Sequence, residues 1–323
     1  MSPLHNWTDL KRPIRILAPM EDVTDTVFRR IVAAAGAPDV FFTEFTRADD
    51  LFGRRSASAL QRMRYTAVER PIVAQIWGND PAAYYDAARW LREQGFAGID
   101  INMGCPKRKI AAKGYCSALI DNRTLAAELI SAAREGAGSV PVSVKTRIGT
   151  SHPVTGDWVR FLLEQQLDAL TIHARTANEM SDVPARWGEI ARAVRIRNEM
   201  GVGTLVIGNG DVQSLDMLYR RADESGVDGV MVGRAIFDNL ELFSGGAFHT
   251  RPPAVRIRRM RDHFELFERE WGSSMNFHAL KKFVGVYVRG FAGADVLTDR
   301  IMRTTALEQA VAICDDYLGG KRC

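Results

Sequence analysis

The residues best suited to chemistry are one thiol and a set of polar side chains, each at the end of an apolar run. In DINMGCPKRKI, residues 100–110, Cys105 follows such a run directly. Cysteine is commonly buried as a small hydrophobic residue, but Gly104 and Pro106 on either side do not suit a core strand, since proline removes a ladder donor. We therefore expect Cys105 to lie on a loop, where its thiol can act as a general acid.

A cluster of cations follows the thiol: Lys107, Arg108, Lys109 and Lys113. A cysteine nucleophile normally needs a positioned base, so these neighbours fit an anionic substrate or cofactor better than a hydrolase dyad. Most charge runs simply face solvent. Next to a reactive loop, the alternative is that the cations hold the phosphates of a nucleic acid without reading its bases.

Eight apolar runs in all end in polar or reactive residues. Parallel strands that alternate with helices can close into a barrel, whose active site lies at the carboxyl ends of the strands. The eight groups at corresponding positions therefore predict one shared site. In chain order they are Pro19 with Met20, Glu44, Gln75, Asn102 with Cys105, Lys145 with Arg147, His173 with Arg175, Asn209 with Asp211, and Gly233 with Arg234.

The last two groups have the composition of a phosphate site. IGNGDV contains Asn209, Gly210 and Asp211, and GVMVGRA contains Gly233 and Arg234. Glycines let backbone N–H groups approach an anion, and the loops after the seventh and eighth strands of a barrel often bind phosphate. The alternative is that tight turns alone require these glycines. The neighbouring arginine favours the phosphate.

Lys145 and His173 end the fifth and sixth runs, so their side chains can point into the mouth of a barrel. A lysine held against a delocalised anionic ring would suit a reduced flavin, whereas an average lysine extends to solvent. His173 could hydrogen-bond a ring or a phosphate, or it could be a buried histidine whose bonds the fold satisfies. Arg175, close behind in HARTA, leaves these two interpretations equally open.

The spacing of the apolar runs predicts an α/β fold. The runs are mostly apolar on both faces, as in buried parallel strands, and segments with helical periodicity separate them. Helix boundaries are recognisable at Gly36, at Asp80-Pro81 and at Asp121 or Asn122. Eight repeats predict a (β/α)8 TIM barrel; the alternative, an open doubly wound sheet, lacks a G-x-G-x-x-G after its first run. The predicted strands are 15–18, 40–45, 72–77, 99–103, 142–146, 169–173, 205–208 and 229–233.

A second, smaller domain is expected after the barrel. The alternation stops at HTRPP, so we predict a catalytic barrel over residues 1–248 and a small all-helical domain over 249–323. The formal net charge is +4, and the positive excess lies in the last quarter of the chain. The alternative is that these helices only decorate the barrel. The arginine-rich residues 46–71 form a connection longer than usual in a barrel, which is typical of functional loops.

Composition limits the class of protein. The chain has 323 residues, of which 46% are hydrophobic, enough for a sizeable core. No apolar run approaches the ~20 residues that span a bilayer, and the N-terminus lacks a signal-peptide pattern, so we expect a cytoplasmic protein without a membrane partner. The cysteines Cys105, Cys116, Cys314 and Cys323 form no C-x-x-C pair, so free thiols and no metal site are expected.

These motifs together resemble the tRNA-dihydrouridine synthase family, in its bacterial, FMN-dependent type. N-x-G-C-P with a downstream K-x-R and H-x-R-T is highly specific, and the motifs follow the family's order over the whole barrel. HALKKFVGVYVRG resembles, more loosely, the family's helical RNA-binding domain. The matching stretches are APMEDVTD (18–25), TEF (43–45), QIWG (75–78), INMGCPKRKI (101–110), SVKTRIG (143–149), HART (173–176), NGD (209–211) and VGRA (232–235).

The resemblance implies an enzyme that uses NADPH and FMN to reduce one uridine in the D-loop of tRNA to 5,6-dihydrouridine. The flavin would give a hydride to carbon 6 of the uracil, and Cys105 would give a proton to carbon 5. Asn102 would help to hold the uracil, with Arg147 and Arg175 as further substrate contacts. The implied flavin residues are Pro19, Met20, Glu21, Gln75, Lys145 and His173 at the ring, and Asn209, Gly210, Asp211, Gly233 and Arg234 at the ribityl phosphate.

The same resemblance implies tRNA as the partner, and no protein partner, so a monomer is expected. A uridine in folded RNA must be extruded to reach a buried flavin, at a cost of a few kcal/mol. Contacts to phosphates from Lys107 and Lys109, from the basic connection and from the helical domain would offset that cost. They would also make binding strongly salt-dependent.

Three departures from the family pattern bear on specificity. Glu21-Asp22 replaces commoner small residues, HART is followed by ANEMSDVPARW, and Lys282-Phe283 stands where a basic residue and His are frequent. The sequence leaves open which uridine is modified and whether NADPH or NADH is preferred. Two rival functions remain: an FMN-dependent dehydrogenase of a free pyrimidine, of the dihydroorotate type, and a non-catalytic, flavin-stabilised RNA-binding protein. The first explains the flavin residues but neither the basic connection nor the helical tail.

Overall fold

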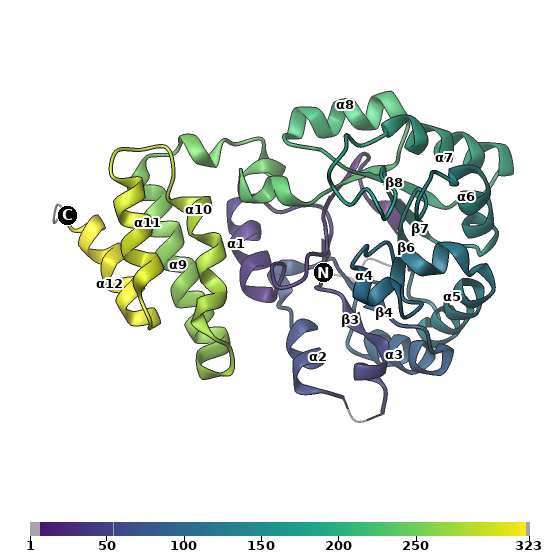
Figure 1. Ribbon diagram of the computed structural model, residues 1–323, viewed down its shortest axis with the longest axis horizontal. Coiled ribbons are helices and arrows are strands. Elements are labelled where there is room, and N and C mark those ends of the chain that lie inside the picture. Colours follow the sequence, from purple (N-terminus) through teal and green to yellow (C-terminus); the bar gives the residue numbers. More distant parts are fainter. Residues whose placement is uncertain (1–6, 54, 321–323) are drawn as a thin grey trace. The chain divides into compact units, whose positions relative to one another are not determined.

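A computed structural model describes residues 7–53 and 55–320 of the chain (Figure 1). Arg54 of the basic connection and Cys323 lie outside the described residues. The chain divides into two compact units, residues up to Thr26 with Pro38–Gly233, and Val27–Ala37 with the residues from Arg234 onward. This division lies before residue 248, so the domain boundary expected there stays a prediction.

The first unit is a barrel of parallel strands. The strands pair in the order β1-β9-β8-β7-β6-β5-β4-β2, with β3 beside β4, and a parallel bridge joins Ile16 of β1 to Val40 before β2. The prediction of a (β/α)8 TIM barrel is therefore confirmed. The strands are β1 (Ile14–Leu17), β2 (Phe41–Phe42), β3 (Thr46–Arg47), β4 (Ile72–Trp77), β5 (Gly98–Met103), β6 (Val142–Arg147), β7 (Ala169–His173), β8 (Leu205–Asn209) and β9 (Gly229–Val232).

Apolar side chains fill the barrel. One core cluster includes Ile16, Phe42, Val73, Ile207 and Met231, all buried, and so connects strands from both ends of the unit's sequence. Fully burying a side chain of this size contributes about 1.5–3 kcal/mol. Because the interior is a packed core, a polar side chain buried there needs a hydrogen-bond partner.

The second predicted strand is wrong in its extent. Residues 40–45 were expected to form one strand, but the structure has two short ones, β2 and β3. Thr43 lies between them and explains the break. Its hydroxyl accepts the N–H of Gln75 at 3.1 Å and donates to the carbonyl of Glu44 at 2.8 Å, so a side chain takes part in place of the regular backbone ladder.

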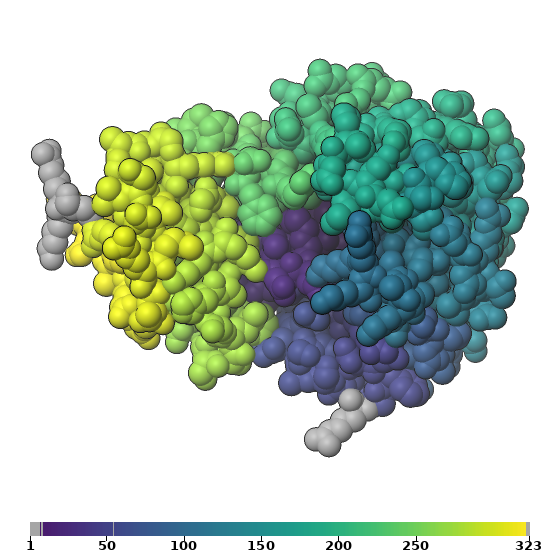
Figure 2. Space-filling model, in the orientation of Figure 1, coloured from purple at the N-terminus to yellow at the C-terminus, as the bar shows by residue number. Residues whose placement is uncertain are grey.

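Helices alternate with the strands and begin where the sequence predicts. Asp80 accepts the N–H of Ala82 at 2.9 Å to cap α3 (Pro81–Glu93), and Asn122 accepts that of Leu125 at 3.2 Å to cap α5 (Arg123–Ala137). In Figure 2 the atoms of these two helices are blue to teal and lie in the closely packed part of that colour. Outside the connection between β3 and β4, the other helices of this unit are η1 (Trp7–Asp9), α4 (Arg108–Ala111), η4 (Cys116–Asp121), α6 (Thr155–Glu164), α7 (Trp187–Met200) and α8 (Leu215–Ser225).

The basic connection between β3 and β4 contains η2 (Ala48–Leu51), α2 (Ala57–Arg62) and η3 (Ala67–Glu69). Several of its arginines have partners within the fold. Arg47 pairs with Asp49 at 3.0 Å, and Arg55 lies 3.7 Å from Asp86. These two guanidinium groups therefore help to order the connection.

The second unit is helical and has an aromatic core. Phe28 stacks on Phe283 and Phe237, with ring centroids 4.8 and 5.8 Å apart. His263 is buried beside them and bonds Tyr287 through Nδ1 at 2.9 Å; burial lowers the pKa of His263 to about 3, so the ring stays neutral. The helices are α1 (Thr26–Gly36), η5 (Arg234–Phe237), η6 (Leu242–Ser244), η7 (Phe248–Thr250), α9 (Pro253–Trp271), η8 (Gly272–Ser274), η9 (Phe277–Phe283), α10 (Val284–Tyr287), α11 (Ala294–Arg303) and α12 (Leu307–Leu318).

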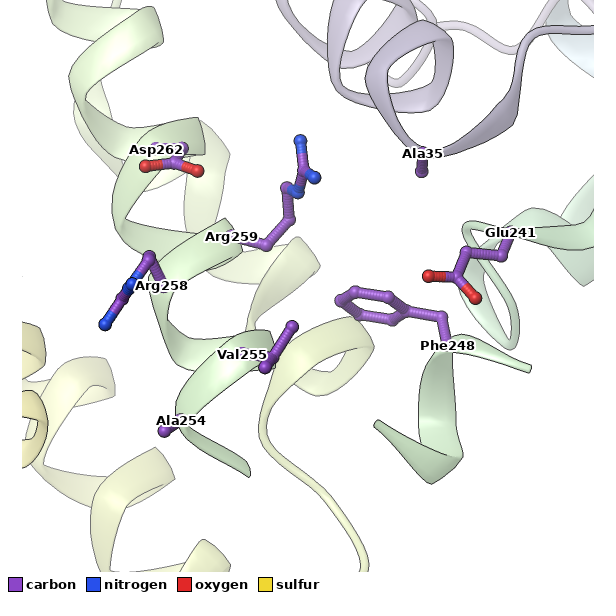
Figure 3. Close-up of a pocket in the computed structure, with 8 residues that line it drawn as sticks. All are labelled: Ala35, Glu241, Phe248, Ala254, Val255, Arg258, Arg259 and Asp262. Atoms are coloured by element: carbon purple, nitrogen blue, oxygen red, sulfur yellow. The ribbon is translucent and has the colours of Figure 1, made fainter. Parts of the chain in front are cut away.

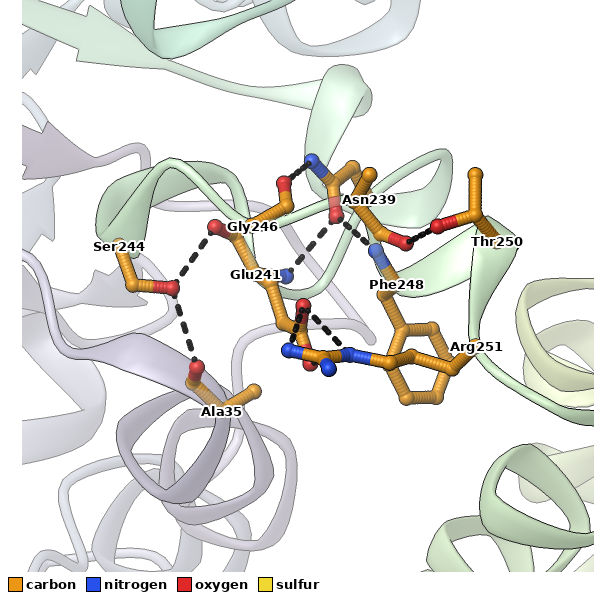
Figure 4. A network of polar contacts seen from close by, with 9 residues as sticks. Ala35, Asn239, Glu241, Ser244, Gly246, Phe248, Thr250 and Arg251 are labelled. Atoms are coloured by element: carbon orange, nitrogen blue, oxygen red, sulfur yellow. Dashed lines mark hydrogen bonds and ion pairs between the residues drawn. The ribbon is translucent and has the colours of Figure 1, made fainter.

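Asn239 organises the chain that leads to α9 (Figure 4). Its amide nitrogen donates to the carbonyl of Gly246 at 2.7 Å. Its amide oxygen accepts the N–H groups of Glu241 and Phe248, at 3.1 and 2.9 Å. Arg251 then pairs with the Glu241 carboxylate at 3.0 Å. One amide thus satisfies three backbone groups in a segment that has little regular structure.

Candidate active site

Four side chains form a row of hydrogen bonds inside the barrel, which we call the amide relay: Ser143, Asp100, Gln75 and Asn102. Ser143 donates to one carboxylate oxygen of Asp100 at 2.6 Å, and the Gln75 nitrogen donates to the other at 2.6 Å. The Gln75 oxygen accepts from the Asn102 nitrogen at 3.1 Å. The four residues come from the neighbouring strands β4, β5 and β6, where Gln75, Asp100 and Ser143 are in register.

Asp100 sets the direction of the relay. It is fully buried, and an ionised carboxylate can only accept hydrogen bonds. Gln75 must therefore present its nitrogen to Asp100, which leaves its oxygen for Asn102. Burial raises the pKa of Asp100 to about 6, against the opposing effect of its bonds from Ser143 and Gln75.

The relay ends on the loop that carries the thiol. The Asn102 oxygen accepts the N–H groups of Gly104 and Cys105, both at 3.0 Å. Gly104 has little room for a side chain, because a Cβ would lie 3.2 Å from the backbone carbon of Thr146. Cys105 itself is half-exposed. The prediction that Cys105 lies on a loop is confirmed, and Asn102 is the residue that fixes that loop.

Arg147 braces the same loop from β6. Its Nε donates to the carbonyl of Gly104 at 2.9 Å, and its Nη1 donates to the carbonyls of Thr176 and Met180 at 2.9 and 2.8 Å. The side chain is 6% exposed, and burial lowers the pKa of Arg147 to about 10. Arg147 therefore connects the thiol loop to the loop after β7. Its predicted contact with a substrate stays a prediction.

A second thiol, Cys116, lies beside Cys105. Cys116 is buried, begins η4, and has a left-handed backbone with φ of 53°. A hydrogen bond from Cys116, followed by the N–H and charge of Lys107, lowers the pKa of the Cys105 thiol, while burial opposes this. The pKa of Cys116 is raised by the same bond and by burial. Cys105 is therefore the more acidic thiol of the pair.

Lys145 lies next to Asn102 in the sheet, on the adjacent strand β6. The side chain is half-buried, and its ammonium has no hydrogen bond or ion pair with any other residue that the structure describes. Burial and the charge of Arg147 lower the pKa of Lys145 to about 8. At neutral pH this position therefore offers a largely cationic group with free donors.

His173, Arg175 and Asp211 form a second cluster at the ends of β7 and β8. Arg175 is 3% exposed; it donates to both carboxylate oxygens of Asp211 at 2.6 Å and bonds His173 Nε2 at 3.2 Å. Because a guanidinium only donates, Nε2 must accept and the histidine proton sits on Nδ1. The N–H of Ala185 also donates to Asp211 at 2.8 Å. Arg175 and Asp211 thus hold the His173 ring in one tautomer.

The predicted phosphate residues have different surroundings. Gly210, with φ of 133°, packs so closely that a Cβ would lie 2.8 Å from Ala185, which favours the tight-turn interpretation at this position. Asn209 donates to the carbonyl of Met231 at 2.7 Å. Gly233 is open, since a Cβ there would meet only the Ala18 side chain at 3.9 Å. Arg234 is exposed and begins η5 of the second unit.

The segment after β1 reaches the thiol loop through an ion pair between Glu21 and Lys107. This pairing raises the pKa of Lys107. Pro19 and Met20, just before it, are half-buried. Glu21 therefore has a structural partner. The cofactor contacts expected of these three residues stay predictions.

The remaining cations after the thiol face outward. Arg108, Lys109 and Lys113 are exposed, and none forms an ion pair with a residue that the structure describes. The first two belong to α4, directly after the thiol loop. Their arrangement suits contact with an external polyanion.

Sequence reasoning missed three residues of this site: Asp100, Ser143 and Cys116. Asp100 stands two positions before Asn102 on β5, so strand alternation puts both side chains on the same face and could have indicated it. Ser143 is two positions before Lys145, for the same reason. The sequence carries no signal for Cys116, because its contact with Cys105 depends on how η4 folds back.

A cavity of about 260 Å³ lies elsewhere, wholly within the second unit (Figure 3). Its polar lining mixes two cations with two acids, so it has no single charge preference, and it contains none of the predicted site residues. Its lining consists of Ala35, Glu241, Phe248, Ala254, Val255, Arg258, Arg259 and Asp262. The cavity is therefore the weaker candidate.

The described residues contain neither a metal-binding cluster nor a membrane-spanning helix. In residues 7–53 and 55–320, no three His, Cys, Asp or Glu side chains gather in a way that could hold a metal ion. Within the same ranges, no helix combines the length and the apolar character needed to cross a membrane.

The fold and the site together define a (β/α)8-barrel protein. A half-exposed thiol and a lysine with no ion pair among the described residues lie toward the carboxyl ends of its neighbouring strands β5 and β6. Solved structures agree on the fold: an old yellow enzyme homologue from Zymomonas mobilis (TM-score 0.52, 14% identity, 74% of this chain and 89% of that one) and a 2-naphthoyl-CoA reductase (TM-score 0.56, 10% identity, 73% and 50%).

Sequence comparison gives the family. A family model described as dihydrouridine synthase matches residues 16–319. The chain is 40% identical over 315 residues to a probable tRNA-dihydrouridine synthase of Staphylococcus aureus (strain COL), covering 96% of this chain and 95% of that one. It is also 40% identical over 318 residues to probable tRNA-dihydrouridine synthase 2 of Bacillus subtilis (strain 168), covering 96% of each. The chain belongs to the dihydrouridine synthase family.

Proposed function

We propose that the protein uses NADPH and FMN to reduce a uridine in the D-loop of tRNA to 5,6-dihydrouridine. The relatives named above are probable tRNA-dihydrouridine synthases, and family membership supports the same activity here. The observation that carries the proposal is local. Asn102 holds the loop of a half-exposed thiol, and the adjacent strand presents a lysine with free donors.

The residues fit a flavin. The Lys145 ammonium has no partner among the described residues, which suits the negative side of a reduced isoalloxazine ring. The oriented His173 supplies a further polar edge at the end of β7, and the open backbone at Gly233 suits a phosphate. Gln75 is buried within β4 with its amide bonded to Asp100 and Asn102, so it would offer a flavin only the second hydrogen of its nitrogen. Asp211, already bonded to Arg175, would act by holding His173 rather than by touching the phosphate. When bound, FMN supplies the hydride for carbon 6 of the uracil.

The protein's own task is to hold the base and deliver a proton. Cys105 donates that proton to carbon 5, from a loop that Asn102 and Arg147 fix through backbone groups. Asn102 is proposed to help hold the uracil through the second hydrogen of its amide nitrogen, because its oxygen already accepts two N–H groups. Arg175 is proposed to affect substrate binding indirectly, by holding the His173 ring in position.

Contacts with tRNA are assigned to the exposed cations. Lys109 and its neighbour Arg108 on α4 face outward directly beside the thiol loop, and Lys107 adds a cation paired with Glu21. Holding phosphates there would offset the cost of extruding one base, which is a few kcal/mol. The helical residues from 249 onward are proposed to be a tRNA-binding domain of a monomeric enzyme, and Arg234 to reach the flavin phosphate.

One experiment tests the proposal. Purified protein should carry FMN and, with NADPH, should form dihydrouridine in tRNA that lacks it. Cys105→Ala should keep its flavin and lose tRNA reduction. Activity on orotate with none on tRNA would support the free-pyrimidine dehydrogenase, and flavin binding without any turnover would support a non-catalytic RNA-binding protein.

If Cys105 acts as a general acid, the direction in which the reaction rate changes with pH is determined. A proton donor has to be protonated, and its neighbours lower the pKa of Cys105. The rate of tRNA reduction in single turnovers should therefore fall as the pH rises through that pKa. A rate that rises over the same range would mean that the thiolate, acting as a nucleophile, is the reactive form.

A further inference from the structure

We propose that Cys105 and Cys116 form a redox-modification site, in which a peroxide oxidises Cys105 and Cys116 then closes an intramolecular disulfide. Neither the family match nor the relatives' names describe such a site. The chemistry needs only the two thiols and a peroxide. Its consequence, the loss of the proton donor, rests on the function proposed above.

The two thiols differ in access but are in contact. Cys105 is half-exposed on its loop, whereas Cys116 is buried at the first residue of η4. The Cys116 side chain hydrogen-bonds the Cys105 sulfur, and η4 packs against the strand that leads to Cys105. An oxidant therefore reaches one sulfur first, and the second sulfur is already its neighbour.

Their acidities suit the two roles that such a pair requires. The thiolate is the form of cysteine that reacts with peroxide, and the pKa of Cys105 is lowered by the bond from Cys116 and by Lys107. Cys116 keeps its proton because the same bond and its burial raise its pKa. Low-pKa, accessible cysteines beside a resolving cysteine are the usual sites of reversible oxidation.

The proposed reaction balances in two steps. The Cys105 thiolate attacks one oxygen of hydrogen peroxide; the O–O bond breaks, sulfur loses two electrons, and hydroxide leaves behind a sulfenic acid. The Cys116 sulfur then attacks the Cys105 sulfur; the S–O bond breaks, and the hydroxyl of the sulfenic acid leaves as water with the Cys116 proton. The hydroxide from the first step takes up the proton that Cys105 released on ionising, so the sum is two thiols and one peroxide giving one disulfide and two waters.

The chain between the cysteines can follow the small movement that closure requires. A disulfide brings the sulfurs to about 2.05 Å. Arg108, Lys109, Ala112 and Lys113 are exposed, and a Cβ at Gly114 would meet nothing within 4 Å. This segment is therefore not locked by packing, unlike the strand before it.

The test uses the FMN-loaded, full-length enzyme treated with hydrogen peroxide, then denatured, alkylated and digested with trypsin without reduction. We expect the peptides 93–107 and 114–123, which carry Cys105 and Cys116, to be found as one linked species lacking two hydrogens. Dithiothreitol should separate them and restore both alkylation sites. A wild-type protein in which Cys105 is converted to sulfinic acid without linkage, or stays unmodified, would overturn the proposal.

Two variants complete the test. In Cys116→Ser, Cys105 should no longer be protected and should proceed to sulfinic acid at the same peroxide dose. Cys314→Ser is the matched control, because Cys314 is a buried thiol of the second unit, and the 105–116 link should form in it as in wild type. Linkage of Cys105 to Cys314 would contradict the proposal. Peptide mapping does not depend on tRNA reduction. If no linked peptide is found, the proposed enzymatic function is unaffected. If the protein does not reduce tRNA, the linked peptide can still be detected.

Discussion

The side-chain nitrogen of Gln75 donates to the Asp100 carboxylate at 2.6 Å, deep in the barrel. Because Asp100 can only accept while ionised, this bond fixes which way the Gln75 amide points, and through it the Asn102 amide. Asn102 in turn fixes the loop of Cys105. A carboxylate that does not touch the thiol therefore determines where the thiol is held.

Two substitutions of Asp100 should distinguish the contribution of its hydrogen bonds from that of its negative charge. In Asp100→Asn the new oxygen can accept from Gln75 and the new nitrogen can donate to the Ser143 hydroxyl, so the relay keeps its direction. Asp100→Ala leaves both partners buried and unsatisfied, at a cost of about 1–3 kcal/mol each. We expect the alanine variant to have a clearly lower melting temperature and the larger loss of tRNA reduction. Equal behaviour of the two variants would contradict the relay.

The pH dependence of stability gives a second measurement on Asp100. Its pKa is about 6 in the folded protein, above the ordinary value of 3.8. Between these values the folded state keeps a proton that the unfolded chain has lost, so this stabilising contribution disappears as the pH rises through about 6. The free energy of unfolding of Asp100→Asn, relative to wild type, should therefore increase over this range by up to ~3 kcal/mol. Chemical denaturation at several pH values measures this difference, and a difference that does not change with pH would contradict the raised pKa of Asp100.

Lys145 should make flavin binding depend on pH. Its pKa is lowered to about 8, so its positive charge is lost as the pH rises through that value. If the ammonium faces the flavin ring, FMN should bind more weakly above about pH 8 than at pH 7. Quenching of flavin fluorescence measures this. Lys145→Met should bind FMN several-fold more weakly at pH 7, and its FMN affinity should no longer depend on pH in this range. If the affinity of the variant still depends on pH, another group is responsible for the dependence.

The sequence was informative about the strands because buried parallel strands are uniformly apolar and end in polar residues. Seven of the eight predicted strands lie close to those observed, and the exception was decided by Thr43, whose hydroxyl enters the sheet. Caps at Asp80 and Asn122 were readable because they satisfy local N–H groups. Such features depend on neighbours in sequence.

What the sequence did not predict depends on contacts between distant residues. The structure gives Arg147 carbonyl partners on two loops, and gives Glu21 a partner in Lys107, 86 positions away. A motif can suggest that an arginine matters, but it cannot say whether its donors meet a substrate or the backbone. The contact between Cys105 and Cys116 belongs to the same class.

Arg147 should be irreplaceable by lysine. One guanidinium bonds the carbonyls of Gly104, Thr176 and Met180, and a single ammonium cannot reproduce that geometry. We expect Arg147→Lys to lose about 1–3 kcal/mol of stability and to change the rate at which iodoacetamide alkylates Cys105. The control is Arg160→Lys, at a surface pair with Glu199 in which both side chains are at least half exposed. If both variants match wild type in alkylation rate, the brace has no role at the thiol.

The exposed cations of α4 should contribute to tRNA binding through phosphates. Arg108→Ala with Lys109→Ala removes two charges beside the thiol loop without removing any ion pair among the described residues. We expect KM for tRNA to rise several-fold, and the slope of log affinity against log salt to fall by roughly 1–2, at ~0.7–0.9 per lost phosphate contact. The matched control is Arg195→Ala with Arg220→Ala, two exposed arginines on the covering helices α7 and α8, with the same change in net charge. Binding measured at several salt concentrations distinguishes the two pairs, and equal losses in both would mean that only overall charge matters.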